Sequence, residues 1–234
     1  MKLPLSKRLL ICAGFVAPGD RVADIGCDHG YLGIYLLNNQ IASSVIASDI
    51  NAGPLQSAVR NAEKYGVQDK MSFYLSDGAQ NIPRDFDTMV CAGMGADTMI
   101  SILEKAQWLR SEKYRLILQC QSKTPMLRKY LTDTGWRIFK ESVLRDGRFL
   151  YTVMEVIWQP GCTLTPGQIY FPPALMENPA KELPEYYQQV CFRLHRAISG
   201  QKENADPQLL QALDELENDP WLQWLKGEHY DNSK

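Results

Sequence analysis

Short apolar runs alternate with longer amphipathic patterns over the first 158 residues of the chain. The short runs are closed by Gly, Asp or other polar residues, which is typical of buried strands. They cover Arg21–Ile25, Ser44–Asp49, Met71–Ser76, Thr88–Cys91 and Tyr114–Gln119. The longer patterns repeat apolar residues at intervals of three and four, which predicts helices over Tyr31–Asn39, Pro54–Tyr65, Asp97–Gln107 and Pro125–Thr134. Strands and helices that alternate in this way predict parallel β-α-β units with right-handed crossovers.

The pattern then changes to two long strands. Arg137–Leu144 and Phe149–Trp158 are joined through Asp146-Gly147, which is a hairpin signal. A parallel sheet that ends in an antiparallel hairpin resembles the Rossmann-like, seven-stranded sheet of class I methyltransferases. We therefore predict an α/β fold with a mostly parallel sheet, an antiparallel C-terminal hairpin and a small helical region after it.

The last third of the chain begins with a proline-rich passage. Six prolines fall between residues 160 and 184, and proline interrupts both helices and strands, so we predict a connecting segment there. Beyond it, Glu185–Ser199 and Gln208–Asn218 show helical periodicity. The chain is therefore expected to consist of a sheet domain, residues 1–158, and a helical appendage, residues 159–234.

Composition and cysteine usage narrow the class of protein. Apolar residues make up 45% of the chain and charged residues 22%, which is ordinary for a globular protein. The apolar runs are too short to span a membrane, and the N-terminus lacks a signal-peptide cleavage site. The six cysteines are widely spaced and the three histidines lie far apart, so we expect buried thiols and no metal. A monomeric cytoplasmic protein is expected.

Charge is uneven along the chain. The formal net charge is −2, yet residues 105–148 hold eleven Lys and Arg residues against four Asp and Glu residues. This basic segment is the candidate surface for a polyanion such as RNA, with Arg128 and Lys129 as docking residues. The alternative is a set of solvated helix faces that bind nothing.

A glycine loop follows the first predicted strand. Asp24-Ile25-Gly26-Cys27-Asp28-His29-Gly30 lies where a doubly wound sheet binds its ligand. A dinucleotide site needs glycine at the position of Asp28, because the backbone must approach a pyrophosphate there. A carboxylate would repel phosphate, which makes a nicotinamide-dependent oxidoreductase the least favoured enzyme class. S-adenosylmethionine carries a sulfonium and an ammonium and no phosphate, so the same carboxylate would attract it.

Two further carboxylates end the next two strands. Asp49 closes the second strand, 25 positions after Asp24, close to the spacing of carboxylates that bind a ribose diol. Asp77, followed by Gly78, ends the third strand, where it could reach an adenine amino group. Each is a weak signal alone, since Asp is common in turns. Together they predict a nucleoside-type donor site along one edge of the sheet.

The fourth strand ends in Cys91-Ala92-Gly93-Met94-Gly95. The acceptor side of a methyltransferase site begins at this strand, and many amino-directed enzymes carry Asn/Asp-Pro-Pro-aromatic here, which this chain lacks. Gly93 and Gly95 instead would leave space for a flat base and expose backbone carbonyls. The alternative is an ordinary glycine turn between strand and helix.

Several segments together resemble the bacterial tRNA (adenine-22-N1)-methyltransferases, in order and over nearly the whole chain. They are Ser6-Lys7-Arg8-Leu9, Asp24-Ile25-Gly26, Asp28-His29-Gly30-Tyr31-Leu32, Gly53-Pro54-Leu55-Gln56-Ser57-Ala58, Ala92-Gly93-Met94-Gly95, Leu118-Gln119 and Tyr170-Phe171-Pro172-Pro173-Ala174-Leu175. The resemblance implies S-adenosylmethionine as cofactor, tRNA as partner and methyl transfer to N1 of adenine 22.

The glycine loop, the three strand-end carboxylates, the glycines after the fourth strand and the resemblance together give the expected residues of the site. Those expected to bind the cofactor are Arg8, Asp24, Gly26, Cys27, Asp28, His29, Gly30, Asp49, Ile50, Asp77, Gly78, Ala92 and Gly93. Those expected to act in catalysis are Asp28, Asp77, Gly93 and Gly95. The C-terminal helices are short and acidic in this chain, so phosphate contacts are expected from the basic segment and from Lys2, Lys7 and Arg8.

Two rival functions stay open at this point. A small-molecule methyltransferase would use the acidic C-terminal helices as a lid and would not bind tRNA. A non-catalytic module that keeps the fold to bind S-adenosylmethionine or RNA would require a spoiled donor pocket, whereas the carboxylate series and the glycine loop are intact in this chain.

Overall fold

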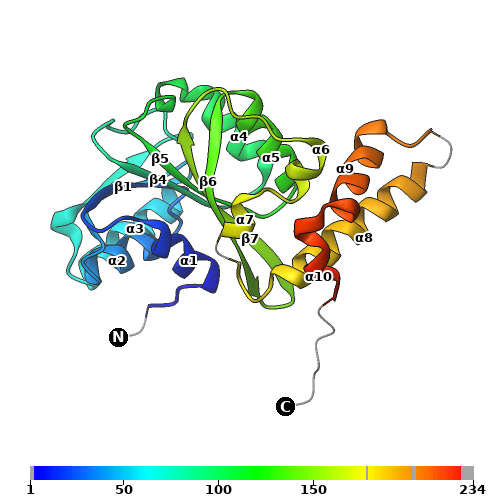
Figure 1. Cartoon of the computed structure of the whole chain (residues 1–234). Helices are drawn as coiled ribbons and strands as arrows, with labels where there is room; N and C mark the ends of the chain where they lie inside the picture. Colours follow the sequence, from blue (N-terminus) through cyan, green and yellow to red (C-terminus); the bar gives the residue numbers. More distant parts are fainter. Residues whose placement is uncertain (1–2, 178, 202–203, 228–234) are drawn as a thin grey trace, which may run out of the picture.

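A computed structural model describes residues 3–177, 179–201 and 204–227 of the chain. Its centre is a seven-stranded sheet with the strand order β3-β2-β1-β4-β5-β7-β6 (Figure 1). The strands are β1 (Asp20–Ile25), β2 (Ala42–Asp49), β3 (Met71–Leu75), β4 (Thr88–Met94), β5 (Arg115–Cys120), β6 (Trp136–Asp146) and β7 (Phe149–Trp158). The pairs among β1 to β5 are parallel, and β7 is antiparallel to both of its neighbours, β5 and β6. The predicted fold class is confirmed.

Helices cover both faces of the sheet. They are α1 (Lys7–Phe15), α2 (Tyr31–Asn38), α3 (Ala52–Lys64), α4 (Ala96–Lys105) and α5 (Thr124–Asp133), with short 3-10 turns η1 (Gln68–Lys70) and η2 (Gln107–Leu109). One buried core packs α1, α2 and α3 on one face, and a second packs α4 and α5 on the other. The alternation of inward residues along β1 and β4 supplies both cores, because successive side chains of a strand point to opposite faces.

The first helix, α1, was not among those predicted. α1 precedes the first strand, and the side chain of its N-cap residue Ser6 accepts a hydrogen bond from the backbone N–H of Leu9 at 3.4 Å. Cys12 and Ala13 are its buried residues. This helix packs on the sheet beside β5, β6 and β7, so the N-terminus and the C-terminal hairpin of the sheet lie side by side.

The proline-rich passage is partly helical, which the expectation of a connecting segment missed. It contains α6 (Pro166–Tyr170) and α7 (Ala174–Glu177). Pro166 occupies the first turn of α6, where its missing N–H removes no hydrogen bond. Thr165 and Gln168 close a capping box at that end, so the same local sequence that breaks a long helix starts a short one.

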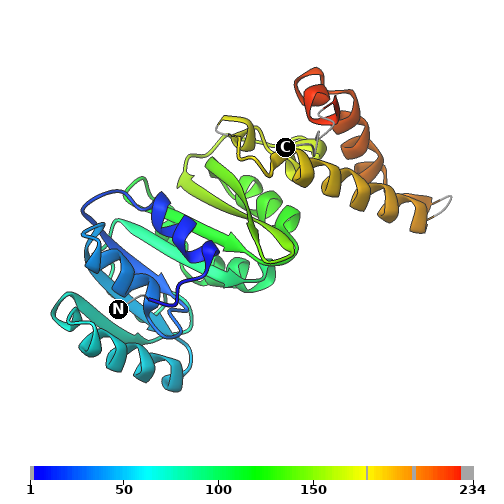
Figure 2. The ribbon, with the colours of Figure 1, turned by 90° about the horizontal axis from the view of Figure 1, so that it is seen from below.

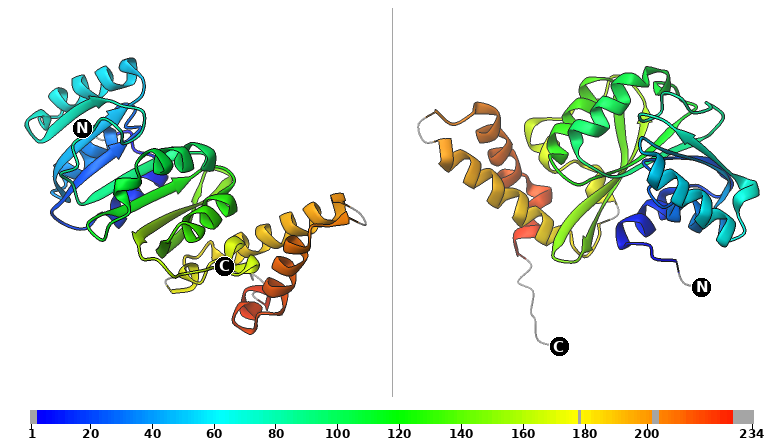
Figure 3. Two further views of the ribbon diagram at one scale, coloured as in Figure 1. Left: turned by 90° about the horizontal axis from the view of Figure 1, so that it is seen from above. Right: turned by 180° about the vertical axis from the view of Figure 1, so that it is seen from behind.

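The C-terminal region is a helical hairpin. α8 (Leu183–Gln201) and α9 (Pro207–Asn218) lie side by side and extend away from the β6–β7 end of the sheet, followed by η4 (Pro220–Leu222) and α10 (Gln223–Gly227) (Figure 2, Figure 3). A third buried cluster joins these helices to Val143 of β6. Within the described residues, no helix has the length and apolar character needed to cross a membrane.

A buried ion pair connects the two regions. Arg128 of α5 and Glu141 of β6 are fully buried, with Arg128 Nη2 2.6 Å from Glu141 Oε1. The guanidinium also donates to the backbone carbonyls of Ile169 and Tyr170 and to the hydroxyl of Tyr186. The sequence-based interpretation of Arg128 as an RNA-docking residue is therefore wrong, because this side chain faces the interior of the protein.

Replacing Glu141 with Ala should destabilise the protein strongly. Loss of one partner leaves a buried charge uncompensated, at a cost of about 3–5 kcal/mol. Urea unfolding followed by circular dichroism measures this free energy. Lys129→Ala is the matched control, because Lys129 and its partner Asp133 are about half exposed and such pairs contribute about 0–1 kcal/mol. Equal losses in the two variants would contradict the assignment of Arg128–Glu141 as a structural centre.

Candidate functional site

A cleft of about 790 Å³ opens at the carboxyl ends of β1 to β4. It lies where parallel sheets of this class bind ligands, between strands whose crossovers run to opposite sides. Residues from all four strand ends and from α1, α2 and α4 line it. They include Arg8, Asp24, Gly26, Cys27, Asp28, His29, Asp49, Ile50, Asp77, Gly78, Ala92 and Gly93, which are twelve of the residues expected at the site.

The loop after β1 is held in place by β2. The backbone N–H groups of Gly26 and Cys27 both donate to the carbonyl of Ser48, at 2.8 and 2.9 Å. Asp28 follows with a φ of +50°, a conformation that is strained for a residue with a side chain and often marks a functional site. Its N–H donates to Asp49 Oδ2 at 3.1 Å, and its carboxylate stays exposed with His29 Nε2 3.7 Å away.

Asp24 is a desolvated carboxylate that lines the cleft. The residue is 4% exposed, and its Oδ2 is buried without a hydrogen-bond partner in the described structure. Burial and the nearby charge of Asp49 raise the pKa of Asp24 to about 7, against a hydrogen bond from the Gly33 backbone that lowers it. Most buried polar atoms have a hydrogen-bond partner, so the unpartnered oxygen of Asp24 is an exception that a bound ligand would explain. Because the carboxylate is removed from water, it would attract a cation.

Asp49 ends β2 and organises the neighbouring loops. Its Oδ2 accepts from the N–H of Asp28, and its Oδ1 accepts from the N–H of Asn51 at 2.9 Å. Each carboxylate oxygen has two lone pairs, so both can still accept from a ligand. Ile50, 62% exposed, follows directly and presents an apolar side chain to the cleft.

Asp77 ends the row at β3. Its Oδ2 lies 2.6 Å from Lys105 Nζ and 3.2 Å from Gln80 Nε2, so a cation already neutralises this carboxylate. Asp28 and Asp77 were both expected to act in catalysis, but the structure gives their carboxylates different neighbours. Lys105 pairs with Asp77, whereas the exposed carboxylate of Asp28 lies 3.7 Å from His29 Nε2.

Ala92, Gly93 and Met94 form the wall of the cleft at β4. Gly93 has a φ of +81°, which a residue with a side chain rarely adopts. The Met94 side chain lies against Gly26, where its terminal methyl group fills the place that a Cβ would occupy. The β1 loop and the β4 wall therefore touch across the cleft.

Two glycines expected at the site do not line the cleft. Gly95 is the N-cap of α4 with a φ of −78°, and a Cβ added there would lie 2.9 Å from Ser122 Oγ, so it faces the β5–α5 loop. The expectation that Gly95 leaves room for a base is not supported, and Gly93 is the glycine exposed at the wall. Gly30 is the N-cap of α2 and faces Ala58 of α3.

Arg8 reaches the cleft from α1. Its Nε donates to Asp146 Oδ2 at 2.9 Å, and its guanidinium lies over the ring of Tyr151, 5.0 Å from the centroid. The β6–β7 turn therefore sets the position of Arg8 at the cleft. Lys2, expected to contact phosphate, lies outside the described residues.

Several lining residues were absent from the expected set. They are Ser6, Leu9, Tyr31, Met94, Asp97, Thr98, Ser101, Ile102 and Gln119 among others. Asp97, Thr98 and Ser101 share one side of α4. Ser101 follows Thr98 by three positions and Asp97 by four, so the sequence could have indicated that these polar side chains lie together after the strand end. Gln119 was visible only within the Leu118-Gln119 resemblance.

Cys27 lines the cleft as a buried thiol. All six cysteines are free thiols, of which Cys162 and Cys191 are partly exposed and four are buried as predicted. Burial raises the pKa of Cys91 to about 12, so this thiol stays protonated at neutral pH. No cluster of three or more potential metal ligands occurs among the described residues.

Comparison with known proteins gives the family. Residues 5–154 match the model of a methyltransferase domain. The crystal structure of the Bacillus subtilis M1A22 tRNA methyltransferase TrmK is similar over 96% of this chain and 98% of that one, at 30% identity and a TM-score of 0.76. The chain belongs to the tRNA (adenine-22-N1)-methyltransferase family.

Two further relatives support this membership. The tRNA (adenine(22)-N(1))-methyltransferase of Bacillus subtilis strain 168 is 36% identical over 154 residues, which is 65% of either chain and just under two thirds of that enzyme's length. The Streptococcus pneumoniae protein Sp1610 was solved in complex with S-adenosyl-L-methionine. It is 28% identical, with a TM-score of 0.78 over 94% of this chain and 99% of that one.

Replacing Asp24 with Asn should stabilise the ligand-free protein at alkaline pH. The folded pKa, about 7, lies above the ordinary value of 3.8, so the folded protein holds an extra proton between these values. Stability therefore falls as pH rises through this window, and the loss is complete above pH 7. We expect the Asn variant to exceed the wild type by roughly 2–4 kcal/mol at pH 8 and to match it near pH 4.

Denaturant unfolding at a series of pH values measures this difference. Asp69→Asn is the control, because Asp69 is exposed in η1. A difference between Asp24→Asn and wild type that does not grow with pH would show that Asp24 is not desolvated in solution.

Proposed function

We propose that this protein transfers the methyl group of S-adenosylmethionine to N1 of adenine 22 in bacterial tRNA, acting as a monomer in the cytoplasm. The observation that carries the proposal is the unpartnered, buried Oδ2 of Asp24 in a cleft lined by further carboxylates. Membership of the family supports the choice of tRNA as substrate.

The negative charge of the cleft and the order of its carboxylates along the strand ends both fit S-adenosylmethionine. Asp24 would receive the ammonium of the methionine part, since this oxygen lacks a partner and a cation favours the ionised carboxylate. Asp49 would accept the ribose hydroxyls on its free lone pairs, and the end of β3 around Asp77 would lie at the adenine. Ile50, exposed beside Asp49, would pack on the adenine ring.

The bound cofactor supplies an electrophilic methyl carbon on its sulfonium. Adenine N1 has a lone pair at neutral pH, so the protein needs no strong base and acts mainly by placing N1 in line with the methyl group. The methylated base is a cation, and a nearby carboxylate stabilises the charge as it develops. Asp28 suits this role better than Asp77, because Lys105 already neutralises Asp77.

Transfer of tritium from labelled S-adenosylmethionine into transcribed bacterial tRNA tests the function. The expected result is one methyl group per tRNA, found as 1-methyladenosine after digestion, and no transfer to tRNA with guanine at position 22. Transfer to neither tRNA would contradict the proposal. The small-molecule alternative would then be tested with the same labelled cofactor and a metabolite extract.

Exposed cations beside the cleft are the expected contacts for tRNA phosphates. Lys7 begins α1, which lines the cleft through Ser6, Arg8 and Leu9. Arg148 is exposed in the β6–β7 turn, two residues after the Asp146 that binds Arg8. A shallow groove of about 420 Å³ runs along the other side of α1 and is lined by Lys7 and Arg145 among others.

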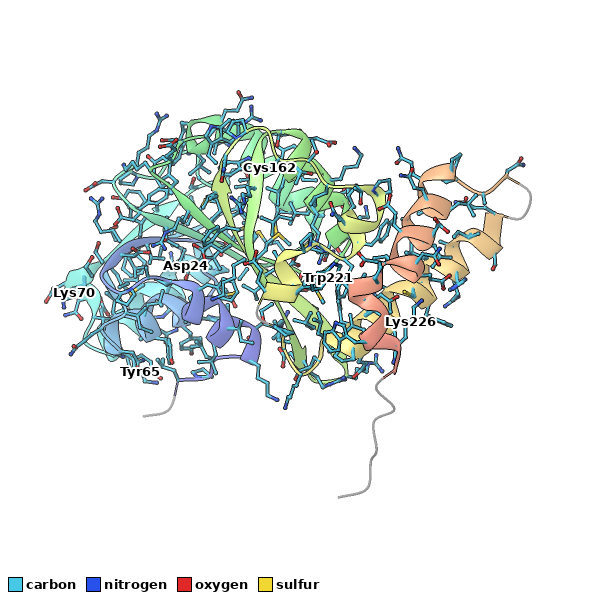
Figure 4. The ribbon with its side chains drawn as sticks, in the orientation of Figure 1. Asp24, Tyr65, Lys70, Cys162, Trp221 and Lys226 are labelled. Carbon is cyan, nitrogen blue, oxygen red and sulfur yellow. The ribbon has the colours of Figure 1, made fainter. Side chains whose placement is uncertain are left out.

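Replacing Lys7 and Arg148 with Glu should weaken tRNA binding and flatten its dependence on salt. Each lost phosphate contact lowers the slope of log affinity against log salt by about 0.7–0.9. Filter binding from 50 to 300 mM salt measures it, and calorimetry should show unchanged affinity for S-adenosylmethionine. The control pair is Lys64→Glu with Lys70→Glu, which reverses two cations between the end of α3 and the start of β3. Figure 4 labels Lys70 at the border of the molecule, away from Asp24. Equal effects of the two pairs would place the RNA elsewhere.

A further inference from the structure

The acceptor wall of the cleft contains a β-bulge. Where β4 pairs with β5, Ala92 lies opposite Gln119 and Met94 lies opposite Cys120, so Gly93 is an extra residue on β4. The extra residue of a bulge loses its partner in the backbone ladder, and bulges beside active sites re-aim the strand. The φ of +81° at Gly93 belongs to this distortion.

The side chain of Gln119 supplies the missing partner. Gln119 is 1% exposed, and its Oε1 accepts from the N–H of Gly93 at 3.1 Å. Its Nε2 donates to the carbonyl of Cys120 at 3.1 Å. A neutral amide can accept and donate at once, whereas a carboxylate only accepts and an apolar side chain does neither. The residue type at this position therefore matches one backbone donor at the bulge, Gly93, and one backbone acceptor beside it, Cys120.

Backbone pairing resumes directly after the bulge. The N–H of Gln121 donates to the carbonyl of Met94 at 2.8 Å, and the N–H of Ala96 donates to the carbonyl of Ser122 at 3.1 Å. The bulge is thus confined to one residue, and it turns the Met94 side chain against Gly26 of the β1 loop. Ala92, Gly93 and Met94 all line the cleft as a result.

We propose that Gln119 is a positioning residue for methyl transfer, which acts by holding the Gly93 bulge that aligns the incoming base with the donor. The proposal rests on the function proposed above. It assigns no contact with the transferred methyl group to Gln119 itself. The effect passes through the backbone of Gly93 and through Met94, which form the wall between the donor loop and the acceptor side.

Gln119→Glu tests this proposal through the pH dependence of the chemical step. The ionised carboxylate can accept from Gly93 but faces the carbonyl of Cys120 with a second acceptor, which is repulsive. The protonated form donates to that carbonyl and restores both bonds, and burial raises the pKa of a carboxyl group. We expect a 10- to 100-fold slower single-turnover rate at pH 8.5 and a ratio to wild type that recovers at least fivefold by pH 6.

The rate is measured with transcribed tRNA at saturating S-adenosylmethionine, which separates the chemical step from donor binding. Donor affinity of the variant should stay within twofold of wild type at pH 8.5. Gln107→Glu, an exposed substitution in η2, is the matched control and should keep a ratio near one at both pH values. Gln119→Met, which can form neither bond, should be slow at both pH values.

Three results would overturn the proposal. The first is a wild-type rate for Gln119→Glu at pH 8.5. The second is a loss that pH does not reverse and that donor affinity shares, since this marks a general packing defect. The third is unchanged hydrogen exchange of the Gly93 amide in Gln119→Met, measured by NMR. This last measurement needs no substrate, so it tests the hydrogen bond between Gln119 and Gly93 even if wild-type protein methylates no tRNA and the proposed function itself fails.

Discussion

The arrangement of the whole chain depends on the buried ion pair between Arg128 and Glu141. A guanidinium removed from water must have its donors satisfied, and this one reaches Glu141, the backbone carbonyls of Ile169 and Tyr170 within the proline-rich passage, and Tyr186. These partners belong to β6, α6 and α8, so the geometry of one side chain fixes where the C-terminal helices meet the sheet domain. β6 in turn carries Asp146, which holds Arg8 at the cleft. The same strand therefore links the helical region to the site.

Two features of the site lower the stability of the ligand-free protein. Asp24 sits in the core with an unpartnered oxygen, and Asp28 is held at a positive φ by Asp49. Both features cost free energy in the ligand-free protein, and both point to a cationic ligand that would offset the first. The cost is tolerable because β1 is central in the sheet and its neighbours are packed on both faces. The candidate site therefore lies on a central, well-packed strand of the sheet, which can tolerate these costs.

The sequence predicted what depends on neighbouring residues. The strands, the crossover helices and the row Asp24, Asp49 and Asp77 follow from local periodicity and from the common edge that parallel strands share. It did not predict burial of Arg128, because the partners of that side chain lie 13, 41, 42 and 58 positions away. Nor did it distinguish Gly93 from Gly95, since the choice depends on how β4 pairs with β5. The sequence named Gln119 in the family resemblance but not its contact with Gly93, which depends on the same pairing.

The basic segment shows why a count of charges is a poor guide to an RNA surface. Of its eleven cations, Lys105, Arg115, Lys123, Arg128, Lys129 and Arg145 form ion pairs. Four of these cations pair with acids from outside residues 105–148, which a count within the segment cannot include. The acids are Asp77, Asp20, Glu155, Asp97 and Glu185, of which Asp20 and Glu155 both pair with Arg115. What attracts a phosphate is an exposed cation without a compensating acid, placed where the substrate must lie. In the described residues Lys7 and Arg148 meet both conditions, and they lie on the two elements that Arg8 and Asp146 bring together beside the cleft.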